Sequence, residues 1–442
     1  MIIHGRVLAA RPWALKTIFL GEPGRPMRID IKISRLPLAA LAAAIAVVAT
    51  PVAAKKKAPA VVGPPIEMSD GFRAGAQAAE AALKARDVAT ASARIASLIP
   101  TNDFESYVAA GMRFQLAAQR RDVQAERIAL TDLFKTAALP RSEAPRLRYV
   151  AAYLSYMVGN YTDATAQLDY AKTLGYDGID ATMLRADIAL RRNKPKDARP
   201  FVQEAIARHK ASGQPVPLAW IDRAISMAYQ AGDWTEVGQL YRDRLNQRDG
   251  KEEWRSALVN YQSAAELEPQ LQLDLYRLQA ANGAMASERD YQAYAQAAEK
   301  SGYYSEAKAI IESGRKAGKL TPTQSVTSQL LKSVTPKATK EIVALPAIAK
   351  KAAVAGNGKD ALAVADSYFS LGQFPQAVEQ YRLALSKGGI DEGRANARLG
   401  VALARSGDLP SAQATLARVS GPWTAIAGFW TAWAQHQDRK VG

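Results

Sequence analysis

The stretch SYFSLGQFPQAVEQYRLAL, residues 367–385, places one glycine between two segments that each have the pattern of a helix. Gly372 has no Cβ, so it can adopt the left-handed backbone conformation that ends a helix. Pro375 suits the first turn of the next helix, where its missing backbone N–H would have no partner. The small Ala377 and the large Tyr381 fit a second helix that packs closely on the first. The stretch therefore predicts two antiparallel helices joined by a tight turn.

The same pattern returns along the chain at regular intervals. The phrases QAGDWTEV, KSGYYSEA, SLGQFPQA and RSGDLPSA contain Gly232, Gly302, Gly372 and Gly407, which are 70, 70 and 35 residues apart. A period of roughly 34 residues is typical of helical repeats, and the abundant alanine favours helix over strand. We therefore predict an all-α fold, in which stacked antiparallel helix pairs form an α-solenoid.

The last two units carry the most specific signal. The segment from Gly358 resembles a tetratricopeptide repeat, whose pattern is W-x2-L-G-x2-Y, then A-x3-F, then P. It departs from that pattern at Ala361, in the first large position, and at Gly389, in place of the proline. The resemblance implies a right-handed superhelix with a concave groove that binds partners. The matching residues are Val364, Ala365, Tyr368, Ala377, Tyr381 and Ala384, then Leu399, Gly400, Leu403, Gly407, Ala412 and Leu416.

Steps of about 35 residues extend this array over residues 68–436 as ten expected helix pairs. The segments from residues 253 and 323 keep the length of a unit but lose the motif. A longer loop over residues 209–218 is expected to bend the array. The Trp- and Phe-rich residues 423–436 predict a helix that caps the last repeat. The clearest expected units are 145–178, 179–212, 218–252, 288–322, 358–392 and 393–422.

A signal for export is predicted near the N-terminus. A positively charged segment, an apolar run over residues 36–48 and a small-residue site ending at Ala54 follow one another. This order is the anatomy of a secretory signal peptide, so we expect cleavage after Ala54 and a periplasmic or secreted protein. The three lysines at residues 55–57 oppose translocation across the membrane of the chain that follows. An uncleaved segment that anchors the protein in the inner membrane is therefore the alternative.

The expected boundaries near the N-terminus follow from this signal. Residues 1–54 are expected to be an extension plus the signal peptide, and translation is expected to start at Met27. A signal peptide seldom carries a leader as long as the residues that precede that methionine. Residues 55–67 are rich in Pro, Ala and Lys and are expected to form a flexible linker.

The composition excludes several classes of chemistry. The chain has no cysteine and only three histidines, which excludes disulfides, thiolate metal sites and the common histidine metal motifs. No nucleophile elbow, phosphate-binding loop or dinucleotide-binding fingerprint occurs in the sequence. We therefore expect a protein that is not an enzyme and uses no cofactor. The net charge is +16, yet an exported protein does not meet nucleic acid, so no nucleic-acid partner is expected.

The resemblance also implies where a partner binds. In tetratricopeptide proteins the first helix of each pair lines the groove, near repeat positions 2, 5, 9, 12 and 13. Three tyrosines of the unit from Pro145 share one helical face, as an exposed aromatic strip or, alternatively, as buried packing. The candidate groove residues of this unit and the next two are Arg146, Tyr149, Tyr153, Tyr156, Asp187, Arg191, Asp222 and Tyr229.

Two functions follow from these observations as hypotheses. The first is a non-catalytic scaffold that binds a protein or peptide in its groove, within a cell-envelope assembly or export process. The alternative is an accessory protein that binds an anionic exopolysaccharide or cell-wall glycan through basic clusters at residues 191–199 and 315–319. Contact with a membrane is expected only if the N-terminal apolar segment is not cleaved.

Overall fold

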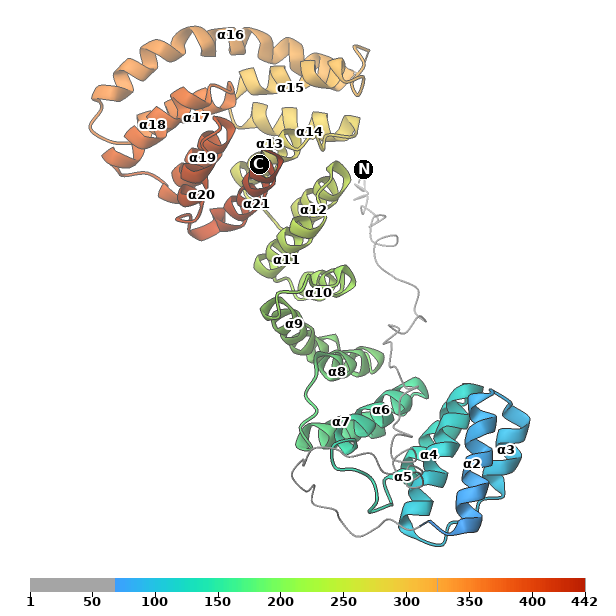
Figure 1. The fold of residues 1–442 in the computed structure, drawn as a ribbon. Coiled ribbons are helices and arrows are strands. Elements are labelled where there is room, and N and C mark those ends of the chain that lie inside the picture. Colours follow the sequence, from blue (N-terminus) through green and yellow to red (C-terminus); the bar gives the residue numbers. More distant parts are fainter. Residues whose placement is uncertain (1–67, 324, 442) are drawn as a thin grey trace, which may run out of the picture. The chain divides into compact units, whose positions relative to one another are not determined.

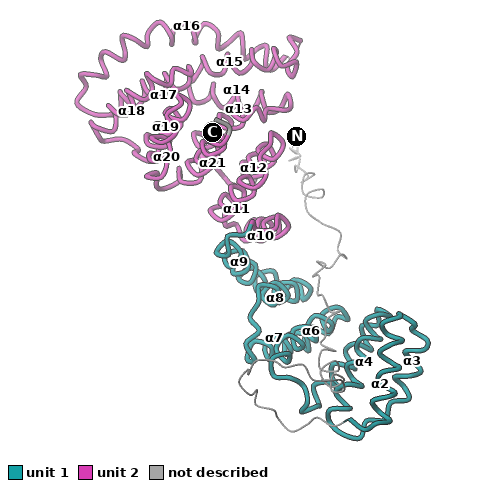
Figure 2. Tube along the Cα trace, in the orientation of Figure 1, with its two compact units in different colours: residues 1–214 teal, residues 215–442 magenta. Residues whose placement is uncertain are grey.

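The computed structural model describes residues 68–441 apart from residue 324. The expected signal peptide, the start at Met27 and the linker over residues 55–67 lie outside the described residues. Within the described residues the chain is α-helical, with one 3-10 turn and no strand (Figure 1). It forms two compact units divided after Gln214 (Figure 2).

Unit 1 consists of antiparallel helix pairs in its described residues. The two helices of each pair contact each other, and the second helix of one pair contacts the first helix of the next. First helices also contact one another directly, α2 with α4 and α6 with α8. The helices are α2 (Asp70–Lys84), α3 (Val88–Ala96), α4 (Asp103–Arg120), α5 (Val123–Leu133), α6 (Ala144–Met157), α7 (Tyr161–Thr173), α8 (Ile179–Arg191) and α9 (Pro195–Ala211).

Unit 2 continues the same architecture with one unpaired long helix and a terminal helix. Its helices are α10 (Leu218–Gln230), α11 (Trp234–Gln247), α12 (Lys251–Ala264), α13 (Pro269–Ala281), α14 (Glu288–Lys300), α15 (Tyr304–Lys316), α16 (Ser325–Val354), α17 (Lys359–Ser370), α18 (Phe374–Lys387), α19 (Glu392–Arg405), α20 (Leu409–Leu416) and α21 (Thr424–Val441). The opening stretch therefore spans the end of α17 and nearly all of α18.

The turns within the pairs have the predicted backbone conformation. Gly372 has φ +70° and Gly232 has φ +69°, both in the left-handed region that ends a helix. Asn193, which stands in place of a glycine, has φ +57°. The side chain of Asp233 then accepts a hydrogen bond from the backbone N–H of Glu236 at 3.0 Å. A Gly-Asp phrase thus ends one helix and caps the next.

Residues 325–354 form one helix, α16, where the repeat period predicts a helix pair. The repeat count included a pair over residues 323–357, although the sequence left the structure of this segment open, and the single helix corrects that count. The segment lacks the glycine-containing turn phrase found at residues 232, 302, 372 and 407. Pro336 and Pro346 lie inside α16 with exposed side chains, so the carbonyl groups that they leave unbonded can face water.

The end of α16 is held by a lysine from a later helix. The Lys387 Nζ donates hydrogen bonds to the carbonyl oxygens of Ala352, Ala353 and Ala355 at 2.8, 2.8 and 2.6 Å. The last carbonyl groups of a helix have no partner within it, and a lysine there also interacts favourably with the helix dipole. This contact fixes the C-terminus of α16 to α18.

The terminal helix α21 covers more than the last repeat. It contacts α19 and α20, as a cap does, and also α11 and α13 at the start of unit 2 (Figure 1). The Phe429 ring meets the Tyr261 ring edge to face at 5.4 Å, and His436 meets Trp254 at 5.9 Å. A helix with apolar side chains on several faces is buried on several sides. Unit 2 therefore closes on itself through α21.

A buried set of charged side chains joins α13, α17 and α19 inside this closed unit. Arg398 is 1% exposed and donates to Asp274 at 3.0 Å and to Asp366 at 2.7 Å. It also donates to the Gln270 Oε1 at 2.7 Å and to the Tyr303 hydroxyl at 3.3 Å. Asp274 and Arg398 lie 124 positions apart in the sequence, so this contact depends on closure of the unit.

Arg277 extends the set of charges toward α15. It donates two hydrogen bonds to Glu306, at 2.8 and 2.7 Å, and one to Asp274 at 2.5 Å. The Tyr294 hydroxyl donates to Glu306 at 2.7 Å. Three guanidinium groups thus face three carboxylates, which leaves this buried set without net charge. We call it the buried charge network; its charged members are Asp274, Arg277, Glu306, Asp366, Arg394 and Arg398.

The network also determines the protonation states of Asp366 and of Tyr381, which contacts it. Burial alone would raise the pKa of Asp366, but the nearby Arg398 and Arg394 outweigh burial, and the pKa lies below its ordinary value. Burial and the charge of Asp366 raise the pKa of Tyr381 well above its ordinary value. Tyr381 therefore stays protonated and donates to Asp366 at 2.7 Å. The second tyrosine of the opening stretch, Tyr381, therefore contacts this network.

Glu105 has the corresponding role at the start of unit 1. Its carboxylate accepts two hydrogen bonds from Ser69, both at 2.8 Å, and two from Thr101, at 2.6 and 2.8 Å. Burial would raise its pKa, but these hydrogen bonds outweigh burial and lower the pKa to about 2. The carboxylate thereby joins the first turn of α2 to the first turn of α4.

The buried charge network should respond strongly to the loss of Arg398. We expect Arg398→Met to lower the free energy of unfolding of unit 2 by about 3–5 kcal/mol, because the buried network would keep three carboxylates but only two guanidinium groups, and one buried negative charge would be uncompensated. Every tryptophan of the described residues lies in unit 2, so tryptophan fluorescence in urea follows this unit. Arg418→Met, at an exposed position, is the matched control. Equal midpoints for the two variants would contradict this role of the network.

Glu105→Gln should lower the stability of unit 1 in a pH-dependent way. The folded pKa of about 2 lies below the ordinary 4.5, so the native carboxylate stabilises the fold fully above pH 4.5 and loses this effect as pH falls toward 2. The difference between native chain and variant, measured by hydrogen exchange of α2 and α4, should therefore shrink over that range. The surface variant Glu204→Gln should show no such convergence; a constant difference for Glu105→Gln would overturn the assignment.

Candidate partner-binding surfaces

The expected tyrosine stripe of α6 divides into one buried and two half-buried side chains. Tyr149 is 2% exposed, and its ring stacks on Tyr176 at 4.9 Å. Burial, together with the charge of Asp180, raises the pKa of Tyr149. Tyr149 is therefore a packing residue, which corrects its assignment to the groove. Its place in the repeat predicts a helical face but does not show how deeply the neighbouring helix covers that face.

Tyr153 and Tyr156 lie together with residues of the next two helices. The rings of Tyr153 and Tyr156 are 6.5 Å apart, and those of Tyr156 and Tyr161 are 6.0 Å apart. All three side chains are half-buried. We call Tyr153, Tyr156 and Tyr161 the tyrosine strip. It presents ring surface and hydroxyl groups from both helices of one repeat.

Two of the predicted charged residues flank the tyrosine strip from α8. The exposed Arg191 donates from its Nε to the Tyr156 hydroxyl at 3.4 Å. Burial raises the pKa of Tyr153, and the nearby Tyr156 and Asp187 raise it further. The structure thus brings together four of the predicted residues, from two successive repeats. Tyrosine hydroxyls, one carboxylate and one guanidinium can donate and accept hydrogen bonds there.

The other predicted residues lie elsewhere. Arg146 is exposed at the start of α6. Burial raises the pKa of Tyr176, and the charge of Arg146 opposes that rise. Asp222 and Tyr229 belong to α10 of unit 2. Asp222 pairs with the Nε of Arg244 at 2.9 Å, and the Tyr229 ring meets Trp234 edge to face at 5.2 Å.

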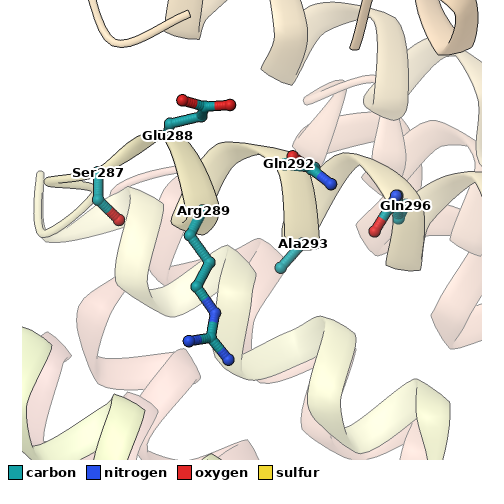
Figure 3. Close-up of a pocket in the computed structure, with 6 residues that line it drawn as sticks. All are labelled: Ser287, Glu288, Arg289, Gln292, Ala293 and Gln296. Atoms are coloured by element: carbon teal, nitrogen blue, oxygen red, sulfur yellow. The ribbon is translucent and has the colours of Figure 1, made fainter. Parts of the chain in front are cut away.

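A hollow on α14 was not among the predicted sites. Its volume is about 500 Å³, and Figure 3 shows its lining side chains along one side of α14. Arg289, Gln292 and Gln296 occupy positions 2, 5 and 9 of the unit that begins at residue 288. The groove positions applied to earlier units would therefore have found it. The residues that line the hollow are Ser287, Glu288, Arg289, Gln292, Ala293 and Gln296.

The two basic clusters lie at the surface, and some of their side chains form an ion pair or a hydrogen bond with neighbouring residues. In the first, the Lys194 Nζ lies 4.0 Å from an Asp197 carboxylate oxygen, whereas Arg192 is exposed. In the second, Arg315 donates to the Ser328 hydroxyl at 2.8 Å, which holds α15 to α16. The clusters therefore add positive surface charge near helix ends without forming a single concentrated site.

The described residues contain no group of three or more side chains arranged to hold a metal ion. None of the described helices combines the length and the apolar character that crossing a bilayer requires.

The different roles of Tyr149 and Tyr156 can be tested by stability. Tyr149→Ala should lower the free energy of unfolding by about 3–5 kcal/mol, as expected when a large buried ring is removed. Tyr156→Ala should cost clearly less, because part of its ring remains in water. Hydrogen exchange of the α6, α7 and α8 amides measures both effects. A larger cost for Tyr156→Ala would show that the assignment of the two tyrosines is reversed.

No protein-family model matches the chain, and no curated protein matches it in sequence. Among solved structures, a Naa15/Naa10 complex bound to HypK-THB is 15% identical over 83% of this chain and 63% of that one, with a TM-score of 0.36. PilF of Pseudomonas aeruginosa is 14% identical over 63% of this chain and 91% of that one, with a TM-score of 0.20.

The TPR2AB domain of yeast Sti1, in complex with pHSP90, is 13% identical over 68% of this chain and 97% of that one, with a TM-score of 0.23. These values are low, so the fold is assigned from the chain itself. Its helices pair with their neighbours, left-handed residues lie within the pairs, and the sequence phrases repeat. The described chain is accordingly an α-helical repeat protein of antiparallel helix pairs, and its repeated phrases resemble the tetratricopeptide repeat.

Proposed function

We propose that this protein is a non-catalytic scaffold that binds a protein or peptide partner, with the tyrosine strip as its principal contact surface. The observation that carries the proposal is the meeting of Tyr153 and Tyr156 with Arg191, from successive repeats, at a 3.4 Å contact between Arg191 and Tyr156. Tyrosine and arginine are the residues most often found at the energetic centre of protein interfaces.

The physical properties of the strip suit a polypeptide ligand. Each half-buried ring offers apolar surface, and its rotamer is already restrained by neighbouring rings, so little side-chain entropy is lost on binding. The hydroxyls and Arg191 can bond to backbone carbonyl groups, while Asp187 offers an acceptor to backbone N–H groups. The hollow on α14, with two glutamines and an arginine, provides similar polar groups in unit 2.

The cellular setting of the proposal comes from the sequence. An export signal at residues 1–54 supports a periplasmic or secreted scaffold in a cell-envelope assembly or export process, with inner-membrane anchoring as the alternative. The second candidate function is binding of an anionic exopolysaccharide or cell-wall glycan. The exposed arginines and lysines near residues 191–196 favour it, since positive side chains attract an anionic polymer.

Pull-down from solubilised envelopes tests the proposal. Tagged residues 55–442 are the bait, bound material is eluted in steps of rising salt, and protein and sugar are analysed in each fraction. We expect a stoichiometric protein partner that survives high salt. Its recovery should fall at least tenfold with the double variant Tyr153→Ala and Tyr156→Ala, because interface anchors are worth about 2 kcal/mol or more.

The control is Tyr170→Ala, which removes a tyrosine that is 48% exposed on α7, outside the strip. This variant should retain the partner at the native level. Equal recovery with the strip variant and the control would remove the strip from the proposal. Carbohydrate released at low salt, without a protein partner, would instead support the glycan-binding function.

A further inference from the structure

The unpaired helix α16 has one face packed on unit 2 and one face in water. Its packed side follows the stripe Thr327, Val334, Ala338, Leu345 and Ala352, all buried, with the seven- and four-residue spacing of one helical face. The helices that contact it are α14, α15 and α17. In the other repeats of unit 2, a second helix accompanies the first. No other helix of the described residues covers the outside of α16.

The uncovered side of α16 carries large apolar side chains. Val343 is 75% exposed and lies opposite the buried stripe, whereas Ile342, 51% exposed, and Ile348, 48% exposed, flank that stripe on its two sides. Val326 and Val354 near the helix ends are also exposed. Among the described residues no other helix exposes as many large apolar side chains. Single exposed apolar residues are common on soluble proteins, but their concentration on one helix marks an interaction surface.

The same side is positively charged. The helix contains five lysines and one acidic residue. The acidic residue, Glu341, accepts hydrogen bonds from the backbone N–H and the hydroxyl of Ser305 at 3.0 and 2.8 Å, so its carboxylate is held against α15. Lys337 lies over the Tyr304 ring at 4.7 Å. The other lysines are exposed, and the described residues form no ion pair with them; they are Lys332, Lys340, Lys350 and Lys351.

We propose that α16 docks on an anionic membrane surface, with Val343 and Val354 facing the interface and the lysines contacting lipid headgroups. A helix with exposed apolar residues, flanking lysines and no exposed acid has the chemistry of interfacial membrane binding. Lysine stems can lie along the apolar boundary while the ammonium groups reach the phosphates. Each lysine near such a surface contributes roughly a fivefold gain in binding.

The shape of α16 favours a lipid surface over a protein groove. The helix is a single rod of thirty residues that arches along the outside of unit 2 (Figure 1). Val343 lies in its middle third, where an arched helix would meet a flat surface first. The hollow of unit 2 is lined from α14, not from α16. A convex, basic and apolar surface fits a fluid anionic boundary, which adapts to it without a complementary cleft.

A probe placed on α16 tests this directly in the full chain. Because the protein contains no cysteine, Val343→Cys can be labelled specifically with an environment-sensitive fluorophore. Vesicles of equal parts phosphatidylglycerol and phosphatidylcholine are then titrated in. The probe reports the surroundings of α16 itself, so attachment through the N-terminal apolar segment alone does not produce the signal. The matched control is the same label on Gln376→Cys, at an exposed position of α18.

We expect a blue shift of the Val343 label with the anionic vesicles, none with phosphatidylcholine alone and none from the Gln376 label. Replacing Lys340, Lys350 and Lys351 by Gln should raise the lipid concentration needed for half-saturation by about fivefold per lysine. These side chains are exposed, so the variant should retain the far-UV circular dichroism and thermal midpoint of the native chain.

Several results would overturn the proposal. They are no shift with anionic vesicles, an equal shift with neutral vesicles, or unchanged half-saturation in the lysine variant. A shift induced equally by soluble polyglutamate would assign the surface to an acidic polypeptide instead of a membrane.

Discussion

Two helices can approach closely only where the side chains between them are small, and this constraint recurs in the repeats of both units. Ala152 and Ala164, and likewise Ala365 and Ala377, are completely buried where the helices of their pairs meet. In the last pair Gly400 takes this place, and a Cβ there would lie 2.6 Å from Leu416. Larger residues such as Leu168 and Tyr381 then fill the space beside the crossing. Each pair leaves an apolar face that its neighbours must cover, so the repeats are stable as a stack.

Unit 2 adds a second constraint, because its interior is not an open groove. The buried charge network occupies the space between α13, α15, α17 and α19, and α21 returns to α11 and α13. Charges taken out of water are tolerated only when they are paired and hydrogen-bonded. Arg398 meets this condition through Asp274, Asp366 and Gln270. The residues that a peptide-binding repeat would offer to a ligand are here partly used to hold the unit closed.

The surfaces left for partners are therefore local and differ in chemistry. The tyrosine strip of unit 1 offers aromatic rings beside one guanidinium and one carboxylate, which suits a polypeptide. The hollow on α14 offers amide groups and Arg289. The outer side of α16 offers apolar side chains among lysines, which suits an anionic boundary. Under the proposed function, a scaffold with such separate surfaces can bind one partner while it is held at another surface.

The sequence by itself determined the helix pairs, their turns and their close crossings. These features depend on residues a few positions apart, so they leave a period, such as the glycines at 232, 302, 372 and 407. It also placed Tyr153, Tyr156, Asp187 and Arg191 on the first helices of two successive pairs. The burial of Tyr149, the single helix α16 and the pairing of Arg398 with Asp274 were decided only by the tertiary structure. Burial depends on what a neighbouring helix covers, and contacts across more than a hundred residues depend on how the unit closes. Neither leaves a local pattern in the sequence.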